Sequence, residues 1–238
     1  MRGKIFLIEG TDGSGKATQS KKLLDRLNSE GTPCQVMSFP QYDTPTGRII
    51  GQCYLGKARE DWSGEGAWFG EADKLDPKIA SLYYAIDRFA ASEKITRTIQ
   101  EGNNLILDRY YPSNMAHQGG KIRDPKEREE LFSWLEKLEF ELLGIPREDL
   151  TIFLHMPTDV AVELRKRRDL KNGTIQNYDG HETNIGHLRR AEETYMQLAK
   201  KYGWEMISCA PDGTIDTLRS LEDIHEEVYA KIRARLNL

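Results

Sequence analysis

Short apolar runs alternate along the chain with longer segments in which apolar residues recur every three or four positions. The short runs are typical of buried strands, and the longer period is typical of helices with one apolar face. Five segments read as strands, at 4–9, 33–39, 104–108, 150–156 and 204–209. Because helical patterns separate them, we expect an α/β fold with a parallel sheet, right-handed crossovers and helices on both faces.

Two segments interrupt this alternation. Residues 56–76 are rich in Gly and charge, and residues 169–182 follow the basic sequence RKRR at 165–168. Long loops inside compact domains are usually functional or disordered. We expect a mobile lid over about residues 165–182, whereas the pattern assigns no role to 56–76. Ligands of parallel sheets bind at the carboxyl ends of the strands, so residues just after each strand are the first site candidates.

Composition narrows the class of protein. The chain has 238 residues, which suits one domain over 1–238, and a net charge of −4, which argues against a dedicated nucleic-acid binder. Its three cysteines have no paired spacing, as in a reduced cytosolic protein. The apolar run before Glu9 is too short for a signal peptide or a membrane span. We therefore expect a cytoplasmic protein with no membrane or nucleic-acid partner.

The segment EGTDGSGKATQ (9–19) nearly matches the phosphate-loop pattern of Gly, four residues, Gly-Lys and Ser or Thr. It lies between a predicted strand and a predicted helix, where backbone N–H groups and the helix N-terminus can wrap phosphates. Lys16 would reach the β- and γ-phosphates of ATP. The residues expected to bind the ATP phosphates are Gly10, Asp12, Gly13, Ser14, Gly15, Lys16, Ala17 and Thr18.

Ala17 replaces the hydroxyl that normally touches Mg²⁺ in this pattern. Mg²⁺ usually keeps several waters, so a water held by Thr18 or Asp108 can fill the missing position. We therefore expect a modified but working site that uses Mg²⁺ with ATP as co-substrate, in which Asp108 contacts the metal through water.

The sequence LDRYYPSNMAHQGGK (107–121) follows the third predicted strand. Asp108 would stand at the strand end beside the phosphate loop, and the planar donor fork of Arg109 suits a phosphate. In LYYAIDRFAAS (82–92), Tyr84 and Arg88 are four residues apart and share one helix face. An aromatic plane beside a guanidinium can clamp a nucleotide base.

Together these segments resemble the thymidylate kinase family, as do FPQYDTPTG (39–47) and the lid sequence NYDGHE (177–182). The resemblance runs through most of the chain in the order of the family. It implies a P-loop NTPase fold, a three-layer sandwich of a five-stranded parallel sheet between helices, with a mobile lid. It also implies transfer of the ATP γ-phosphoryl group to dTMP, giving dTDP and ADP, by a homodimer.

The resemblance assigns roles to single residues. Asp12 would contact the sugar 3′-hydroxyl, Phe39 and Tyr84 would line the thymine site, and Arg88 would donate to thymine O4. Tyr178 would cover the nucleotide from the lid. The full dTMP set is Asp12, Phe39, Tyr42, Tyr84, Arg88, Arg109, Asn114, His117, Gln118 and Tyr178, in which Tyr42 and Arg109 meet the acceptor phosphate and Asn114 meets the base edge.

Besides Ala17, two positions depart from common family patterns. His117 stands where members often carry Tyr or Phe near the sugar, so the resemblance does not establish discrimination against a 2′-hydroxyl. Gly13 stands where one branch of the family has an arginine, so the resemblance is to the branch that supplies this charge from the lid. Among the lid arginines we favour Arg165 and Arg168 over Arg167. The expected catalytic residues are Lys16, Asp108, Arg109, Arg165 and Arg168.

Three other functions stay open on the sequence. A nucleoside kinase needs a carboxylate base near its acceptor, and after the second predicted strand no acid occurs before Asp43. A purine or cytidine monophosphate kinase differs only in the monophosphate accepted. A non-catalytic nucleotide-binding module would explain Ala17, but it has no need for Lys16, Arg109 and a basic lid.

Overall fold

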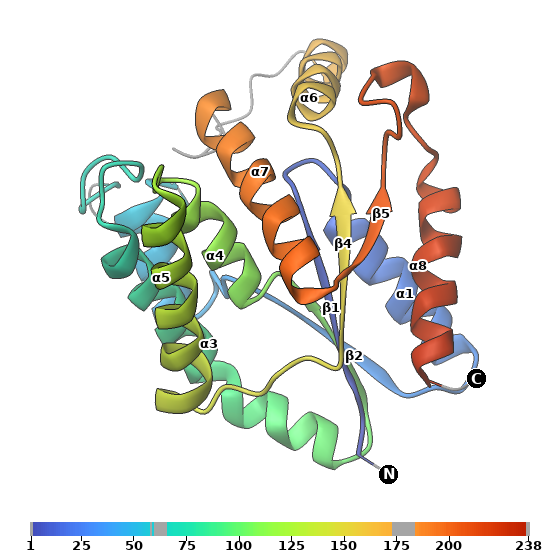
Figure 1. Ribbon diagram of the computed structural model, residues 1–238. Coiled ribbons are helices and arrows are strands. Elements are labelled where there is room, and N and C mark those ends of the chain that lie inside the picture. Colours follow the sequence, from blue (N-terminus) through green and yellow to red (C-terminus); the bar gives the residue numbers. More distant parts are fainter. Residues whose placement is uncertain (1, 58, 60–65, 173–183, 237–238) are drawn as a thin grey trace.

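The computed structural model describes residues 2–57, 59, 66–172 and 184–236 (Figure 1). Its five strands form one sheet in the order β2-β3-β1-β4-β5, and every pair of neighbours is parallel. The strands are β1 (Ile5–Gly10), β2 (Cys34–Ser38), β3 (Asn104–Asp108), β4 (Leu150–His155) and β5 (Glu205–Ser208). The five predicted strands and their parallel arrangement are confirmed.

The helices connect the strands and cover the sheet. They are α1 (Lys16–Ser29), α2 (Pro45–Arg48), α3 (Pro77–Gln100), α4 (Tyr111–Gly119), α5 (Pro125–Glu136), α6 (Thr158–Asn172), α7 (Ile185–Tyr202) and α8 (Leu221–Leu236). Wider helical turns form η1 (Ile49–Tyr54) and η2 (Lys137–Leu142), and a short tight one forms η3 (Ile215–Thr217). Helices α3 and α5 each begin with an aspartate cap, Asp76 or Asp124, followed by a proline, which fixes where the helix starts.

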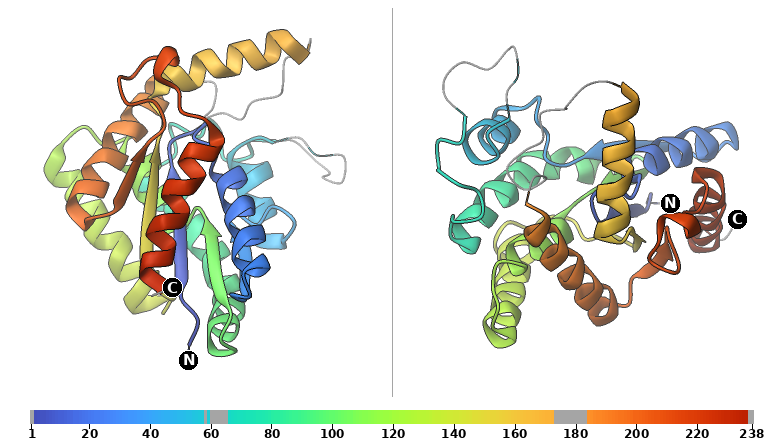
Figure 2. Two further views of the ribbon diagram at one scale, coloured as in Figure 1. Left: turned by 90° about the vertical axis from the view of Figure 1, so that its right-hand side faces the viewer. Right: turned by 90° about the horizontal axis from the view of Figure 1, so that it is seen from above.

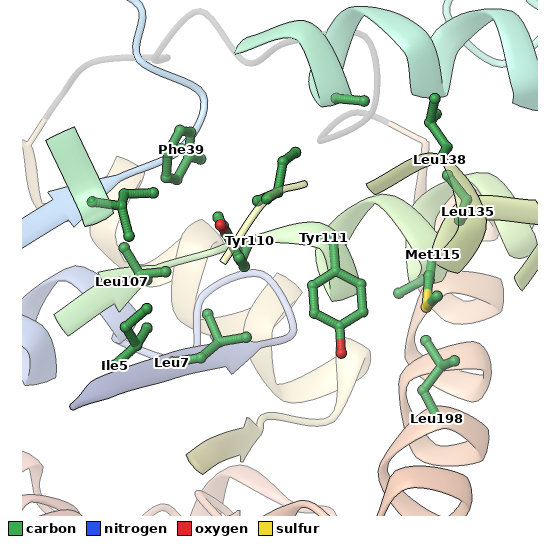
Figure 3. Packing of buried hydrophobic residues seen from close by; sticks show 14 of the residues in the cluster. Ile5, Leu7, Phe39, Leu107, Tyr110, Tyr111, Met115, Leu135, Leu138 and Leu198 are labelled. Carbon is green, nitrogen blue, oxygen red and sulfur yellow. The ribbon is translucent and has the colours of Figure 1, made fainter. Parts of the chain in front are cut away.

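The sheet lies between two layers of helices. Helices α1 and α8 pack on one face, and α3, α4, α5 and α7 lie on the other (Figure 1). Because successive side chains of a strand point to opposite faces, Ile5 and Leu7 of β1 join one core, while Phe6 and Ile8 join the other. Figure 3 shows part of the first core, where Leu7 lies near Tyr110. The three-layer sandwich expected from the sequence is confirmed.

A third, smaller core lies beyond these layers. Ile50 and Tyr54 of η1 pack with Leu55, Ala72 and Ala80. The sequence did not predict α2 or η1, because each spans too few residues to show a helical period. This core attaches the described part of the 56–76 segment to the start of α3.

The carboxyl ends of the strands carry the predicted site. Helix α6 projects over this edge of the sheet (Figure 2). Residues 173–183, which include Tyr178 and most of the predicted lid, lie outside the described residues. In the part of the chain that the structure describes, no helix is long and apolar enough to cross a membrane.

Candidate active site

The phosphate loop joins β1 to α1, and its glycines are required by its geometry. Gly13 and Gly15 have φ angles of 79° and 82°, which other residues rarely adopt. A Cβ on Gly10 would come within 2.5 Å of Ser14 Oγ and 2.6 Å of the carbonyl oxygen of Leu154. The loop conformation therefore follows from the spacing of these three glycines.

Thr11 ties the loop to the end of β4. Its Oγ1 donates to the carbonyl oxygen of Met156 at 2.6 Å and accepts from the Met156 N–H at 2.9 Å. Ala17 and Thr18 are exposed at the start of α1, next to the loop. The predicted phosphate-binding residues therefore form one continuous cradle at the carboxyl edge of the sheet.

The Lys16 ammonium lies inside this cradle. Its Nζ donates to the carbonyl oxygens of Gly10 at 3.0 Å and Thr11 at 2.9 Å, and the residue is buried. Burial, assisted by the charge of Arg109, lowers the pKa of Lys16 to about 8, although Asp108 and other nearby carboxylates oppose this effect. The oxygens of an entering phosphate would replace these two carbonyl oxygens as hydrogen-bond acceptors from Lys16 Nζ.

Arg109 reaches across the cleft from the end of β3. Its backbone has a φ of 65°, an uncommon and costly conformation for a residue with a side chain. Its guanidinium forms an ion pair with Asp12 of the phosphate loop and donates to Ser113 Oγ at 3.3 Å. Burial opposes the charged forms of both partners, but Asp12 raises the pKa of Arg109, and Arg109 with Lys16 lowers the pKa of Asp12.

Glu9 supports the turn that carries Arg109, a role that the sequence analysis missed. This fully buried carboxylate accepts hydrogen bonds from the backbone N–H groups of Tyr110 (2.8 Å) and Ser113 (3.2 Å), from Ser113 Oγ (2.8 Å) and from the Tyr195 hydroxyl (3.0 Å). Burial raises its pKa, although the charge of Arg109 opposes the shift. Its one sequence signal is an acid at the end of an apolar run, directly before a phosphate loop.

A cavity of about 220 Å³ opens beside Arg109. Its lining combines the aromatic side chains of Phe39, Tyr42 and Tyr84 with the charged side chains of Asp12 and Arg109. Nine of the ten side chains predicted to bind dTMP line it, and the tenth, Tyr178, lies outside the described residues. The lining residues are Asp12, Phe39, Pro40, Tyr42, Leu55, Lys57, Tyr84, Arg88, Arg109, Tyr110, Ser113, Asn114, His117 and Gln118.

Arg88 is held in the cavity wall by a carboxylate from η2. Its Nε donates to Glu139 Oε2 at 2.9 Å and its Nη2 donates to Oε1, and both residues are fully buried. Burial disfavours the charge of Arg88, but Glu139 raises its pKa above the ordinary value. Tyr84, four residues earlier, also lines the cavity and meets Tyr54 edge to face with ring centres 5.9 Å apart. The predicted shared face of Tyr84 and Arg88 is confirmed.

Two buried amides give the cavity unsatisfied acceptors. Asn114 Nδ2 donates to the carbonyl oxygen of Ser81 at 3.3 Å, and Gln118 Nε2 donates to the Tyr54 hydroxyl at 3.3 Å. Among the described residues, Asn114 Oδ1 and Gln118 Oε1 are buried and have no hydrogen-bond partner. Because buried polar atoms are nearly always hydrogen-bonded, these oxygens suit a ligand that brings an N–H donor.

The remaining predicted residues lie around the same edge. Asp108 ends β3 and pairs in register with Ile8, two residues before Gly10. Arg165 and Arg168 lie on α6, while Arg167 Nε donates to Glu163 at 2.9 Å within that helix. No group of three metal-binding side chains occurs among the residues described.

Comparison with known proteins gives a consistent result. The sequence model of the thymidylate kinase family matches residues 8–228. A probable thymidylate kinase from Pyrococcus horikoshii is 29% identical over 238 residues, 99% of this chain and 98% of that protein. Human thymidylate kinase is 28% identical over 233 residues, 95% of this chain and 88% of that protein.

A solved structure of thymidylate kinase from Candida albicans has the same fold. It superposes with a TM-score of 0.69 and 22% identity, covering 99% of this chain and 93% of that one. The sequence resemblance was carried by separate motifs, and the family match now extends over nearly the whole chain. The chain belongs to the thymidylate kinase family.

Proposed function

We propose that this chain transfers the γ-phosphoryl group of ATP to dTMP, giving dTDP and ADP. Membership of the thymidylate kinase family supports the reaction. One observation in this chain carries the proposal: Arg109, which lines the cavity, pairs with Asp12 of the phosphate loop and lies close enough to Lys16 for its charge to assist burial in lowering the pKa of that ammonium. The donor and acceptor phosphates would meet between these two cations.

The chemistry requires alignment and charge neutralisation. The attacking group is already a phosphate oxygen, so no residue has to remove a proton from it. Lys16 would bind the β- and γ-phosphates, while Arg109 would exchange part of its contact with Asp12 for the acceptor phosphate. Fixed charges that match the developing transition-state charge are the main catalytic device of phosphoryl transfer.

The cavity suits a thymine nucleotide. Phe39 and Tyr84 would hold the ring between apolar surfaces, and Arg88, oriented by Glu139, would donate to a carbonyl oxygen. The unsatisfied oxygens of Asn114 and Gln118 would accept from the ring N–H. Tyr42 would meet the acceptor phosphate, and Asp12 would accept from the sugar 3′-hydroxyl.

Mg²⁺ fits the donor side of this cleft. Asp108 supplies a carboxylate at a strand end adjoining the phosphate loop, and this ion usually takes its other ligands from water and substrate phosphates. A bound Mg²⁺ would neutralise phosphate charge. Asp108 would hold the ion through water, and a further water would replace the hydroxyl that Ala17 lacks.

The predicted lid, about residues 165–182 of a single domain over 1–238, completes the proposed cycle. Arg165 and Arg168 would bring positive charge to the phosphates from α6, and Tyr178 would cover the nucleotide. Closure over the cleft would exclude water, which competes as a phosphoryl acceptor. The position of α6 over the carboxyl edge of the sheet supports this role (Figure 2).

A homodimer in the cytoplasm is the expected state. Ile79, Ile86 and Phe89 lie on one face of α3 and are 45%, 47% and 51% exposed. An apolar stripe of this kind on a helix surface supports packing against a second copy. Light scattering would test this by measuring the molar mass of the unaltered protein and of Phe89→Asp. If the dimer packs through this stripe, the charge that Phe89→Asp introduces should dissociate it into monomers.

A coupled assay of ADP formation tests the proposed reaction. ADP should accumulate with dTMP and only slowly without it, and Lys16→Met should abolish the dTMP-dependent rate. Replacing dTMP by thymidine, dUMP, UMP, dCMP, dGMP or AMP separates the alternatives. Equal rates with thymidine would indicate a nucleoside kinase, and faster rates with a purine monophosphate would also contradict the proposal.

A further inference from the structure

A carboxylate of α7 holds the start of α6. Glu192 Oε2 accepts hydrogen bonds from the Thr158 backbone N–H at 2.9 Å and from Thr158 Oγ1 at 2.6 Å. His155 Nε2 lies 2.8 Å from Glu192 Oε1 and donates to it, because an ionised carboxylate can only accept. Thr158 is the first residue of α6 and is buried. We call Glu192, Thr158 and His155 the α6 anchor.

This anchor differs from the caps of the other helices. Asp76 and Asp124 directly precede the helices that they cap, whereas Glu192 lies 34 residues from Thr158. The first N–H groups of a helix lack partners within it, and a negative charge there is favourable. Burial disfavours the charge of Glu192, but the hydrogen bonds from His155 and Thr158 lower its pKa. The start of α6 therefore depends on the position of α7.

Helix α7 is a firm support for the anchor, because it packs against α4 as well as α6. Tyr195 follows Glu192 by three residues and lies on the same side of the helix. Its hydroxyl donates to Glu9 at 3.0 Å and lies 2.9 Å from Ser113 Oγ. Glu9 also holds the turn that carries Arg109. Helix α7 is thus fixed to the acceptor side of the cleft, and Glu192 ties α6 to it.

The start of α6 also touches the phosphate loop. A Cβ on Gly13 would lie 3.2 Å from the Cβ of Ala161, three residues after Thr158. Thr11 holds Met156, just before the helix, through two hydrogen bonds. From this start, α6 projects over the carboxyl edge of the sheet (Figure 2). The phosphate loop and α7 together determine where the helix begins and in which direction it runs.

The length of α6 amplifies any change at its start. Arg168 follows Thr158 by ten residues, so its backbone lies about 15 Å along the helix, and a tilt of about 10° would displace it by about 2.5 Å. Displacements of about 1 Å at a reacting centre can cost about a hundredfold in rate. Small movements of the first turn should therefore have large effects on the arginines of α6.

We propose that Glu192 is a positioning residue for phosphoryl transfer. By holding the first turn of α6 against α7, it keeps Arg165 and Arg168 within reach of the phosphates. Glu192 itself touches neither substrate. This inference rests on the proposed function, in which these two arginines bring positive charge to the phosphates.

Steady-state kinetics of ADP formation test the anchor. Glu192→Ala removes it and leaves every residue that lines the acceptor cavity in place. We expect kcat to fall about 10- to 100-fold, while KM for dTMP changes less than about threefold. Glu193→Ala is the matched control, because Glu193 is the exposed neighbour of Glu192 on α7, and it should change neither value.

Glu192→Gln should rescue most of this loss. The amide oxygen can still accept from Thr158, and the amide N–H can donate to Nε2 of the other neutral tautomer of His155. We expect kcat within about threefold of the unaltered protein. Melting temperatures of all variants show whether a loss of kcat accompanies a loss of stability.

A double-mutant cycle separates positioning from general stability. In the background Arg165→Ala/Arg168→Ala, Glu192→Ala should lower kcat by less than about threefold, because the anchor acts through these arginines. If Glu192→Ala does not fold, Thr158→Val is the second probe, because it removes only the hydroxyl donor. It should lower kcat about fivefold, as expected for one hydrogen bond, and this loss should also disappear in the arginine-free background.

Three results would overturn the role of Glu192. One is the same fold-loss of kcat in both backgrounds, which would indicate a purely structural residue. Another is a folded Glu192→Ala whose kcat stays within about threefold of the unaltered protein. The third is an unchanged kcat in Arg165→Ala/Arg168→Ala, since the anchor would then have no catalytic charges to position. Absence of dTMP turnover in the unaltered protein would instead contradict the proposed function.

Discussion

The phosphate loop and the acceptor cavity, which share Asp12, are built in different ways. The loop is one continuous segment whose shape follows from three glycines and a strand-to-helix turn. The cavity is lined by side chains from several elements, and its cations depend on carboxylates far away in the sequence. The donor site is therefore a local structure, and the acceptor site is a product of tertiary packing.

This difference predicts the largest effects where the two regions meet. Lys16→Met and Arg109→Ala each remove one cation from the phosphates, so kcat should fall roughly a thousandfold or more. Circular dichroism should show an unchanged fold. Near-normal turnover in either variant would remove that residue from the mechanism.

Glu9→Gln tests whether the acceptor site depends on its hidden support. The amide would present N–H groups toward the donors of Tyr110 and Ser113, and the turn that carries Arg109 should shift. We expect kcat to fall about 10- to 100-fold, with a higher KM for dTMP and a melting temperature lower by several degrees. A lower melting temperature with unchanged kinetics would mean that Glu9 stabilises the fold without positioning Arg109.

The pH profile should distinguish the two regions further. Because burial lowers the pKa of Lys16 to about 8, its side chain carries a positive charge below that pH and loses its proton above it. In the free enzyme, kcat/KM for ATP should therefore fall above about pH 8, approaching tenfold per pH unit. Phosphate charges raise the pKa of Lys16 in the complex, so kcat should decline only at higher pH.

Lys16→Arg is the control for this profile. Its guanidinium stays charged, so the decline near pH 8 should disappear even if turnover is lower. The same decline in Lys16→Arg would mean that another group titrates.

The smallest effect is expected at Ala17. Restoring a hydroxyl with Ala17→Ser replaces one water ligand of Mg²⁺ and should change kcat by less than about threefold. Titration of Mg²⁺ at fixed ATP should show a modest gain in apparent affinity. A gain of an order of magnitude would mean that water does not substitute for the hydroxyl.

The same contrast explains what could be predicted from the sequence. The strands and the phosphate loop carry local signals, namely apolar runs and glycine spacing, and both were found. Tyr84 and Arg88 were also predicted to share a face, because a helix relates residues four apart. These features depend on short stretches of chain.

The supporting residues have no such signal. Glu139 lies 51 residues from Arg88, and Glu192 lies 34 residues from Thr158. Within its own stretch, Glu139 is one of many charges on an amphipathic helix. Its burial beside Arg88 follows only from the packing of η2, so periodicity could not reveal it.

The most direct test measures both products in one reaction. ATP and dTMP are incubated with the unaltered protein and with Arg109→Ala, and dTDP and ADP are quantified by ion-exchange chromatography. The account predicts equal amounts of dTDP and ADP from the unaltered protein, and almost none of either from the variant. ADP formed without dTDP, or dTDP formed at the same rate by Arg109→Ala, would contradict transfer between phosphates held by Lys16 and Arg109.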